Sequence, residues 1–218
     1  MTLTAQPAAP APSNGVDLSR RYTREEYFAL PEGPPYYELV DGKLVMSPRP
    51  SVRHQQLLMF LTVHLWPHAV GVLGGELISE PNLLLPGTED VLQPDFLYLG
   101  PEQLGFLSDL VVEGAPEMVC EVLSPSTRRR DHGAKLTAYQ QARVSHVWLI
   151  DPQAPLAVLE YVLDADGRYR LEANLEAPGI WTPALFPGWS LDLSAAQARL
   201  FTGATATDPM SETSEGGD

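Results

Sequence analysis

The segment from Glu117 to Leu123, EMVCEVL, constrains the fold most strongly, because it is almost entirely apolar and yet carries an acid within the run. A short apolar run of this kind is typical of a central strand that is covered on both faces. The turn-forming residues SPST follow it, and then come a helical segment from Asp131 to Ala142 and a short apolar strand from His146 to Ile150. This order of strand, helix and strand predicts an α/β or α+β fold with helices on the faces of a sheet.

The flanking segments predict further strands and helices. Asp41-Gly42 lies between two apolar-rich runs in YELVDGKLVM, which predicts a β-hairpin. Thr23 and Glu26 have the spacing of a capping box at the start of a short helix. The other expected elements are helices over 24–30 and 52–66, strands over 76–85 (disturbed at Pro81) and 91–99, a hairpin of 156–163 with 169–175, and a C-terminal segment against the sheet edge.

Length and composition indicate one domain, which we assign to residues 17–207 of the 218. Residues 1–16 are rich in Pro and Ala, and residues 208–218 contain acids but no base, so we expect a disordered leader and a disordered acidic tail. The single cysteine, Cys120, excludes an internal disulfide and favours a reducing compartment such as the cytoplasm. No secretory signal or membrane-spanning stretch is recognisable, so we expect no membrane partner.

The formal net charge of −14 is unusual for a protein that acts on nucleic acid. Proteins that bind DNA without sequence specificity usually have a basic surface, because their affinity comes from neutralised phosphates. The only dense basic run here is Arg128-Arg129-Arg130. The charge therefore weakens the case for a DNA substrate without excluding one.

Asp95 in VLQPDFLYL and Glu121 in MVCEVL are the first candidates for a functional site, because each acid lies in an otherwise apolar strand segment. Ionised carboxylates are rarely buried unless they are paired or bound to a metal. Each acid alone can be explained by an arginine partner near a strand end. If the two strands are neighbours, the carboxylates converge, and two carboxylates with water suit Mg²⁺ or Mn²⁺ better than Zn²⁺.

Basic and aromatic residues beyond Glu121 can complete such a site. Lys135 and Tyr139 are four residues apart and project from one helical face. An ammonium at a metal-bound water can stabilise charge on a phosphoryl group, whereas the alternative for Lys135 is a solvated helix lysine. The run Arg128–Arg130 and Tyr139 are candidate contacts to nucleic acid, although such arginine runs are often only solvated turns.

Other polar side chains are weaker candidates. His64 and His68 are four residues apart, but Pro67 is expected to break the helical turn between them, which favours surface histidines over a metal pair. Ser124 and Ser126 are interpreted as turn and cap residues, because no His–Asp relay accompanies them. Trp148 is expected in the core, and Trp181 and Trp189 are expected to form a packed C-terminal cover rather than a base-stacking surface.

The sequence resembles the Uma-two-type restriction endonuclease family, a branch of the PD-(D/E)xK nuclease superfamily. The resemblance extends from about Tyr22 to Leu193 and rests on YELVDGKLVMSP, His54, QPD at 93–95, EVLSPSTRRRD at 121–131, Lys135, Tyr139 and VWLID at 147–151. The sequence departs from the usual family pattern at Arg143 and Val147, where Gly and Tyr are commoner. The resemblance implies a restriction-endonuclease-like mixed central sheet with flanking helices and β-hairpins.

Residue by residue, the resemblance makes Asp95 the acid of the PD element and Glu121 the acid of the (D/E)xK element. The lysine of that element falls at Leu123 and is missing, so its role is assigned to Lys135 on the following helix. Glu38 and His54 match family positions and are added to the candidate catalytic residues.

These residues support two hypotheses from different classes. The first is a DNA endonuclease in which Asp95 and Glu121 hold Mg²⁺ and Lys135 assists phosphodiester hydrolysis, with a homodimer as a reasonable way to cut two strands. The second is a nuclease-fold protein that binds nucleic acid or regulates another protein with little or no catalysis, either alone or beside a basic partner. The missing lysine at Leu123 and the charge of −14 favour the second.

We expect that deleting residues 1–16 and 208–218 together leaves the melting temperature within a few degrees of that of the full chain. Both segments are poor in large apolar residues and cannot repay the entropy of ordering. Differential scanning calorimetry of both chains measures this, and loss of cooperative unfolding would show that one segment docks into the core.

Overall fold

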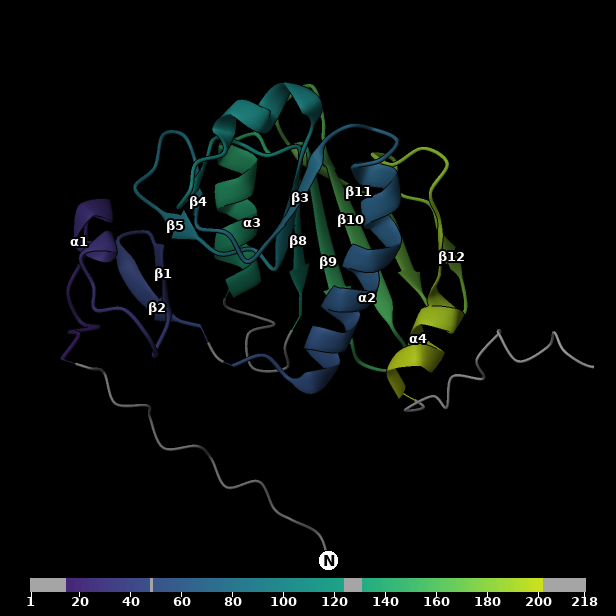
Figure 1. The fold of residues 1–218 in the computed structure, drawn as a ribbon, viewed down its shortest axis with the longest axis horizontal. Helices are drawn as coiled ribbons and strands as arrows, with labels where there is room; N and C mark the ends of the chain where they lie inside the picture. The colour runs from purple at the N-terminus through teal and green to yellow at the C-terminus, as the bar shows by residue number, and fades with distance from the viewer. Residues whose placement is uncertain (1–14, 48, 124–130, 202–218) are drawn as a thin grey trace, which may run out of the picture.

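The computed structural model describes residues 15–47, 49–123 and 131–201, and its centre is a six-stranded mixed sheet (Figure 1). The strand order is β11-β10-β9-β8-β6-β3. The pair β8–β9 is parallel and the other pairs are antiparallel. The bounds are β3 (Glu76–Ser79), β6 (Phe96–Leu99), β8 (Met118–Val122), β9 (His146–Asp151), β10 (Ala157–Leu163) and β11 (Tyr169–Glu176). The strand at EMVCEVL is therefore central, as its apolar run predicts.

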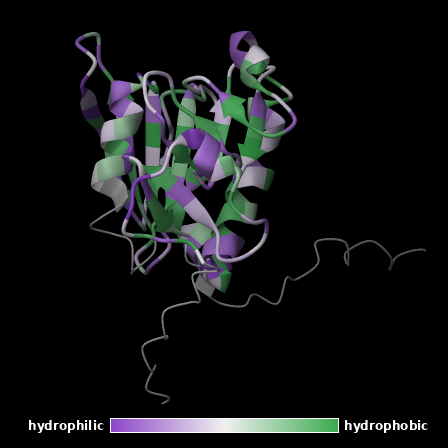
Figure 2. Ribbon diagram, turned by 90° about the vertical axis from the view of Figure 1, so that its left-hand side faces the viewer, coloured by the Kyte–Doolittle hydropathy of each residue, from purple (hydrophilic) through white to green (hydrophobic). Residues whose placement is uncertain are grey.

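Helices cover both faces of this sheet. On one face, α2 (Val52–Ala69) and α4 (Leu193–Phe201) pack on a core that includes Cys120 and Trp148. On the other face, α3 (Asp131–Gln141) packs on Val119 and Val147. Successive residues of β8 thus enter different cores, and Figure 2 shows that hydrophobic residues concentrate along the strands between the helices.

A second, five-stranded sheet has the order β2-β1-β5-β4-β7. Its strands are β1 (Tyr37–Val40), β2 (Lys43–Met46), β4 (Leu83–Leu84), β5 (Val91–Leu92) and β7 (Val112–Glu113). The short 3₁₀ helix η1 (Pro101–Phe106) precedes β7. In the β1–β2 hairpin, Asp41 and Gly42 have φ of 46° and 67°, the left-handed pair that a tight two-residue turn requires.

The two strands predicted over 76–85 and 91–99 are each divided between the two sheets. The first becomes β3 and β4, and the second becomes β5 and β6. Pro81 and Pro94 lie at the two breaks, and a proline has no N–H to continue a ladder. Glu80 also has a left-handed φ of 49°, which turns the chain out of β3. The chain therefore passes between the two sheets twice, from β3 to β4 and from β5 to β6, and the two connections are hydrogen-bonded to each other through Glu80 N–H and the carbonyl of Asp95.

The first two helices agree in part with the predicted bounds. The predicted capping box is present, since Thr23 and Glu26 bond reciprocally at the start of α1 (Arg24–Phe28), which ends two residues early. The predicted break at Pro67 is wrong, because α2 continues to Ala69. A proline in the last turn removes a single helical hydrogen bond, and the burial of Leu65 and Ala69 offsets that loss. His64 is exposed, as predicted, and His68 is half-buried.

The C-terminal segment covers a face of the six-stranded sheet rather than its edge. The rings of Trp181 and Trp189 lie 4.4 and 6.4 Å from the ring of Trp148, centroid to centroid, so the predicted packed cover is confirmed. The segment also forms α4, which the sequence analysis missed. The sequence does contain a signal for this helix. Asp192 is its N-cap and accepts a hydrogen bond from the backbone N–H of Ser194, and the apolar residues 193, 196 and 200 follow at helical spacing. The segment's short strands are β12 (Ile180–Trp181) and β13 (Leu191–Asp192).

A buried acid, Glu160 of β10, ties this cover to the sheet. Its carboxylate accepts hydrogen bonds from Trp181 Nε1 at 3.0 Å and from the backbone N–H of Ala184 at 3.1 Å. Burial raises the pKa of Glu160 above its usual value, although the two donors oppose that shift. The sequence analysis did not single out this residue.

We expect that Glu160→Leu destabilises the protein by about 2 to 5 kcal/mol, because it leaves the two buried donors without acceptors. Urea denaturation followed by tryptophan fluorescence measures the change, and Glu176→Leu on the exposed edge of β11 is the control. The folded-state pKa of Glu160 is raised, so its protonation contributes stability below about pH 4.5 that is lost as the pH rises. Wild type should therefore lose stability relative to Glu160→Gln between pH 4 and pH 7, and a constant difference would contradict this explanation.

Candidate active site

The candidate site lies where β6 begins and β8 ends. β6 and β8 are antiparallel neighbours whose ladder ends at the pair Phe96–Cys120, and Asp95 and Glu121 are the residues next to this pair, Asp95 just before Phe96 and Glu121 just after Cys120. Asp95 itself lies in the bend just before β6 rather than inside a strand, which corrects the prediction for this residue. Glu121 lies inside β8, as predicted.

Asp95 is held by two contacts. Its Oδ1 lies 2.8 Å from His54 Nε2, and its Oδ2 accepts a hydrogen bond from the backbone N–H of Val122 at 2.6 Å. His54 lies in the first turn of α2, whose N-cap is Ser51 as predicted. Burial disfavours the charged imidazole, but the hydrogen bond and charge of Asp95 outweigh it and raise the pKa of His54. This imidazole therefore fixes the orientation of the Asp95 carboxylate.

Lys135 of α3 is buried between two carboxylates. Its Nζ lies 2.9 Å from Glu38 Oε2, and 3.1 and 3.2 Å from the two carboxylate oxygens of Glu121. Only 9% of the residue is exposed, so the alternative of a solvated helix lysine is wrong. Burial disfavours the ammonium, but the charges of Glu121 and Glu38 outweigh it and raise the pKa of Lys135. Lys135 thus stays protonated near neutral pH.

Glu121 carries more negative charge around it than Lys135 compensates. Burial raises the pKa of Glu121 to about 7; the ammonium of Lys135 opposes this shift, and the charges of Asp95 and Glu38 add to it. The hydroxyl of Tyr139 donates a hydrogen bond to Glu121 Oε1 at 2.6 Å. The site therefore favours a further positive charge near Glu121, from a proton or from another cation.

Gln93 connects the acids through its backbone, and the sequence analysis gave this residue no role. Its N–H donates to Glu38 Oε2 at 3.3 Å, and its carbonyl accepts from Lys135 Nζ at 3.4 Å. Its side-chain amide is held in turn by Asn82 Oδ1 at 2.9 Å and by the hydroxyl of Tyr27 at 3.3 Å. The only sequence signal was its position beside Pro94 and Asp95 in the QPD motif.

The structure thus brings together five of the residues selected from the sequence: Glu38, His54, Asp95, Glu121 and Lys135. Tyr139 joins them, but it is buried and bonds Glu121, so its position does not suit the predicted contact with nucleic acid. Leu123, where the family lysine is missing, packs against the hydrophobic core between α3 and the six-stranded sheet. Ser124, Ser126 and Arg128, Arg129 and Arg130 lie outside the described residues.

The donors at this site fit a hard divalent cation by their chemistry. Asp95 and Glu121 offer carboxylate oxygens, which Mg²⁺ and Mn²⁺ prefer, and Mg²⁺ commonly uses one or two carboxylates with water. No three His, Cys, Asp or Glu side chains among the described residues are arranged as a ready-made metal site. Two carboxylates and the unbalanced charge at Glu121 are therefore the features that fit a cation.

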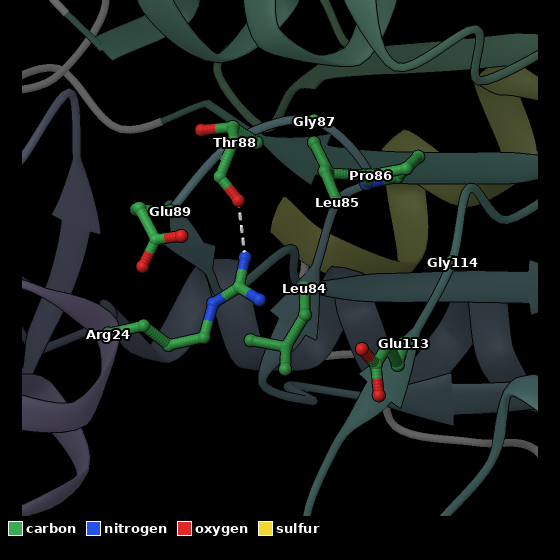
Figure 3. Close-up of a pocket in the computed structure, with 9 residues that line it drawn as sticks. All are labelled: Arg24, Leu84, Leu85, Pro86, Gly87, Thr88, Glu89, Glu113 and Gly114. Carbon is green, nitrogen blue, oxygen red and sulfur yellow. Dashed lines mark hydrogen bonds between the residues drawn. The ribbon is translucent and has the colours of Figure 1, made fainter.

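Two surface hollows lie beside the five-stranded sheet, and in the part of the chain that the structure describes neither is lined by Asp95, Glu121 or Lys135. In the first, of about 480 Å³, Arg24 reaches across to the carbonyl of Thr88, with Glu89 and Glu113 nearby (Figure 3). The second, of about 890 Å³, separates the Asp41–Gly42 turn from one face of α3. Its charged lining is mostly acidic (Arg21, Asp41, Glu89 and Asp90), which does not suit a phosphate backbone.

The mixed sheet, its helices on both faces and the acids at the β6–β8 end define a restriction-endonuclease-like fold of the nuclease type. A crystal structure from Anabaena variabilis ATCC 29413, described as a “putative nuclease belonging to DUF820”, has this fold with a TM-score of 0.65 and 18% sequence identity, over 82% of this chain and 98% of that one. The chain belongs to the Uma-two family, described as “Putative restriction endonuclease”, whose profile matches residues 24–194. No curated protein sequence matches it significantly.

Among the described residues, no helix is both long enough and apolar enough to cross a bilayer.

We expect that Lys135→Met destabilises the protein by about 3 to 5 kcal/mol at pH 8, because two buried carboxylates lose their counter-charge. The loss should be smaller at pH 5, since Glu121 has a raised pKa and is protonated there in the folded protein.

Urea denaturation at both pH values measures this difference. Lys43→Met, which changes an exposed lysine of β2, is the matched control. Adding Glu121→Gln to Lys135→Met should recover part of the lost stability. Equal stabilities of wild type and Lys135→Met at pH 8 would mean that the ion pairs are not formed.

Proposed function

We propose that this chain is a Mg²⁺-dependent endonuclease that hydrolyses phosphodiester bonds in DNA. The observation that carries the proposal is the contact of the Lys135 ammonium with both oxygens of Glu121, one register step from Asp95. An acid pair and a lysine are the side chains that the PD-(D/E)xK elements require, and here the lysine reaches the acid from α3 instead of from the same strand. Membership of the family supports the same activity.

Asp95 and Glu121 are the residues that would hold Mg²⁺ or Mn²⁺. A bound divalent cation would lower the pKa of a water molecule and neutralise charge on the phosphoryl oxygens. Glu121 is suited to this task because burial and neighbouring acids leave its negative charge poorly compensated. Asp95 is suited because His54 and the Val122 N–H hold its carboxylate in one orientation.

Lys135 would act as a charge donor and not as a base, because Glu121 and Glu38 keep its ammonium protonated. A protonated lysine at the carboxylate that holds the cation can orient the attacking water or stabilise charge developing on the phosphate. Glu38 would hold the ammonium at 2.9 Å while Glu121 binds the cation. Tyr139 would position Glu121 through its 2.6 Å hydrogen bond.

Contacts with the substrate are a further part of the proposal. Arg128, Arg129 and Arg130 precede α3 in the sequence and would contact backbone phosphates. A homodimer would bring two such sites to the two strands of a duplex.

A second candidate is a nuclease-fold protein that binds nucleic acid, or regulates another protein, without useful catalysis. Two observations favour it. The net charge of −14 disfavours non-specific DNA binding, and Lys135 is already engaged by two carboxylates. A cleavage assay separates the two candidates.

We expect wild-type protein to cleave supercoiled, linear or single-stranded DNA with Mg²⁺ or Mn²⁺, and to stop when EDTA is added. Asp95→Asn and Glu121→Gln should lose both Mn²⁺ binding in calorimetry and cleavage. Lys135→Met should retain Mn²⁺ binding, but its cleavage rate should fall by about 100-fold or more, the scale of losing one transition-state charge donor. Single-turnover rates, measured where circular dichroism shows each variant to be folded, test this.

Controls separate catalysis from stability. Lys135→Arg should rescue cleavage poorly, because a planar guanidinium does not reproduce a compact ammonium. Lys43→Met should cleave like wild type, since Lys43 is exposed on β2. The catalytic proposal fails if wild type cleaves neither DNA nor RNA with either metal. If wild type cleaves and Lys135→Met cleaves equally fast, the assignment of the lysine is wrong.

A further inference from the structure

Helix α2 is apolar on two opposite faces. The face toward the sheet buries Leu57, Leu61 and Leu65, as a helix that covers a core should. The opposite face is open to solvent and carries Met59 (65% exposed) and Val63 (58% exposed). A surface helix normally has polar and charged residues on that side, so this second apolar face is unexplained by the fold.

One row of residues follows this open side of α2, and we call it the outer row: the exposed residues Val52, Gln56, Met59, Val63 and Trp66, and then Val70, the half-buried C-cap residue of the helix. Their spacings are four, three, four, three and four residues, the spacing of a seam between two packed helices. Trp66 is 48% exposed and Val52 is 77% exposed, so the row stays accessible over the whole helix. Scattered exposed apolar residues are ordinary, but a contiguous row marks a contact surface.

The outer row carries no charge, which narrows the choice of partner. Charged residues make up 19% of the chain, yet Arg53 is the only Asp, Glu, Lys or Arg in the 18 residues of α2, and it lies outside the row. A nucleic acid or an anionic membrane would need basic residues here. An uncharged surface is the part of a −14 chain where a second copy can approach with the least repulsion.

We propose that the outer row is a homodimer interface in which α2 packs antiparallel against α2 of a second copy. The order of spacings is the same in both directions, so a two-fold axis beside Leu61 pairs every member of the row with another member. Met59 of one copy meets Val63 of the other, and Gln56 meets Trp66. Such pairing of a surface with itself is the definition of an isologous interface.

The dimensions of the helix and its neighbour are compatible with this contact. An 18-residue helix is about 27 Å long and about 10 Å wide, so α2 can form the centre of an interface, but alone it covers less than the roughly 800 Å² per partner that a stable dimer buries. Helix α4 lies beside α2, as Figure 1 shows. Trp66 has the residue type most often found at the centre of such interfaces.

Sedimentation velocity of the full chain tests the proposal. Wild type should be a dimer at micromolar concentration. Val63→Glu and Met59→Lys, each alone, should raise the dimer dissociation constant by about 30-fold or more, the scale for a central interface residue. An equimolar mixture of the two variants should dimerise again, because the antiparallel register brings the new glutamate of one copy against the new lysine of the other.

Leu110→Glu is the matched control, because it changes an even more exposed apolar residue that lies outside α2. It should leave the dimer intact, and circular dichroism should be unchanged for all three variants. A wild type that is monomeric at 100 μM overturns the proposal. A dimer that survives Val63→Glu, or a mixture that fails to restore it, overturns the interface or its register. A monomer that becomes a dimer when residues 202–218 are deleted would identify that segment as the occupant instead.

Discussion

The burial of the Lys135 ammonium between Glu38 and Glu121 is the interaction on which the rest of the site depends. An unpaired charge in that position would be costly, so the pair requires α3, the β1 strand and the β8 strand to meet at one point. Gln93 contributes to the same meeting point, because its backbone is hydrogen-bonded to both Glu38 and Lys135. It lies where the chain passes from β5 of one sheet to β6 of the other. The two sheets are joined by the same contacts that assemble the acids.

Opposite faces of the six-stranded sheet supply the two halves of the site. His54 comes from α2 on one face, and Lys135 and Tyr139 come from α3 on the other. Asp95, at the strand end, is bonded to His54 and to the backbone of Val122, next to Glu121. An acid at a strand end can reach past the sheet, whereas a residue within the strand points to one face only. The bend before β6 therefore lets Asp95 contact His54 of α2, which the alternation of an uninterrupted strand would not allow.

The turns and caps could be predicted because their signals are local, whereas several of the wrong predictions concern features that depend on distant contacts. The capping box at Thr23 and the Asp41-Gly42 turn depend on neighbours a few residues away, so they could be predicted. The division of 76–85 and 91–99 between two sheets depends on how those segments pair with strands elsewhere in the chain. The same is true of Glu160, whose burial arises from Trp181 and Ala184, more than twenty residues later. Helix α2 extended past Pro67 because packing outweighed a local preference.

The sequence by itself determined which side chains could form the site, because an acid in an apolar strand must find a partner or a cation. It also determined the central order of strand, helix and strand at β8, α3 and β9, since periodicity is a property of consecutive residues. Only the tertiary structure decided that Lys135 bonds Glu121 and Glu38, that Tyr139 is buried and that Gln93 joins them. Those contacts link residues 14 to 97 positions apart, and such separations are closed by packing of the whole domain rather than by any local pattern.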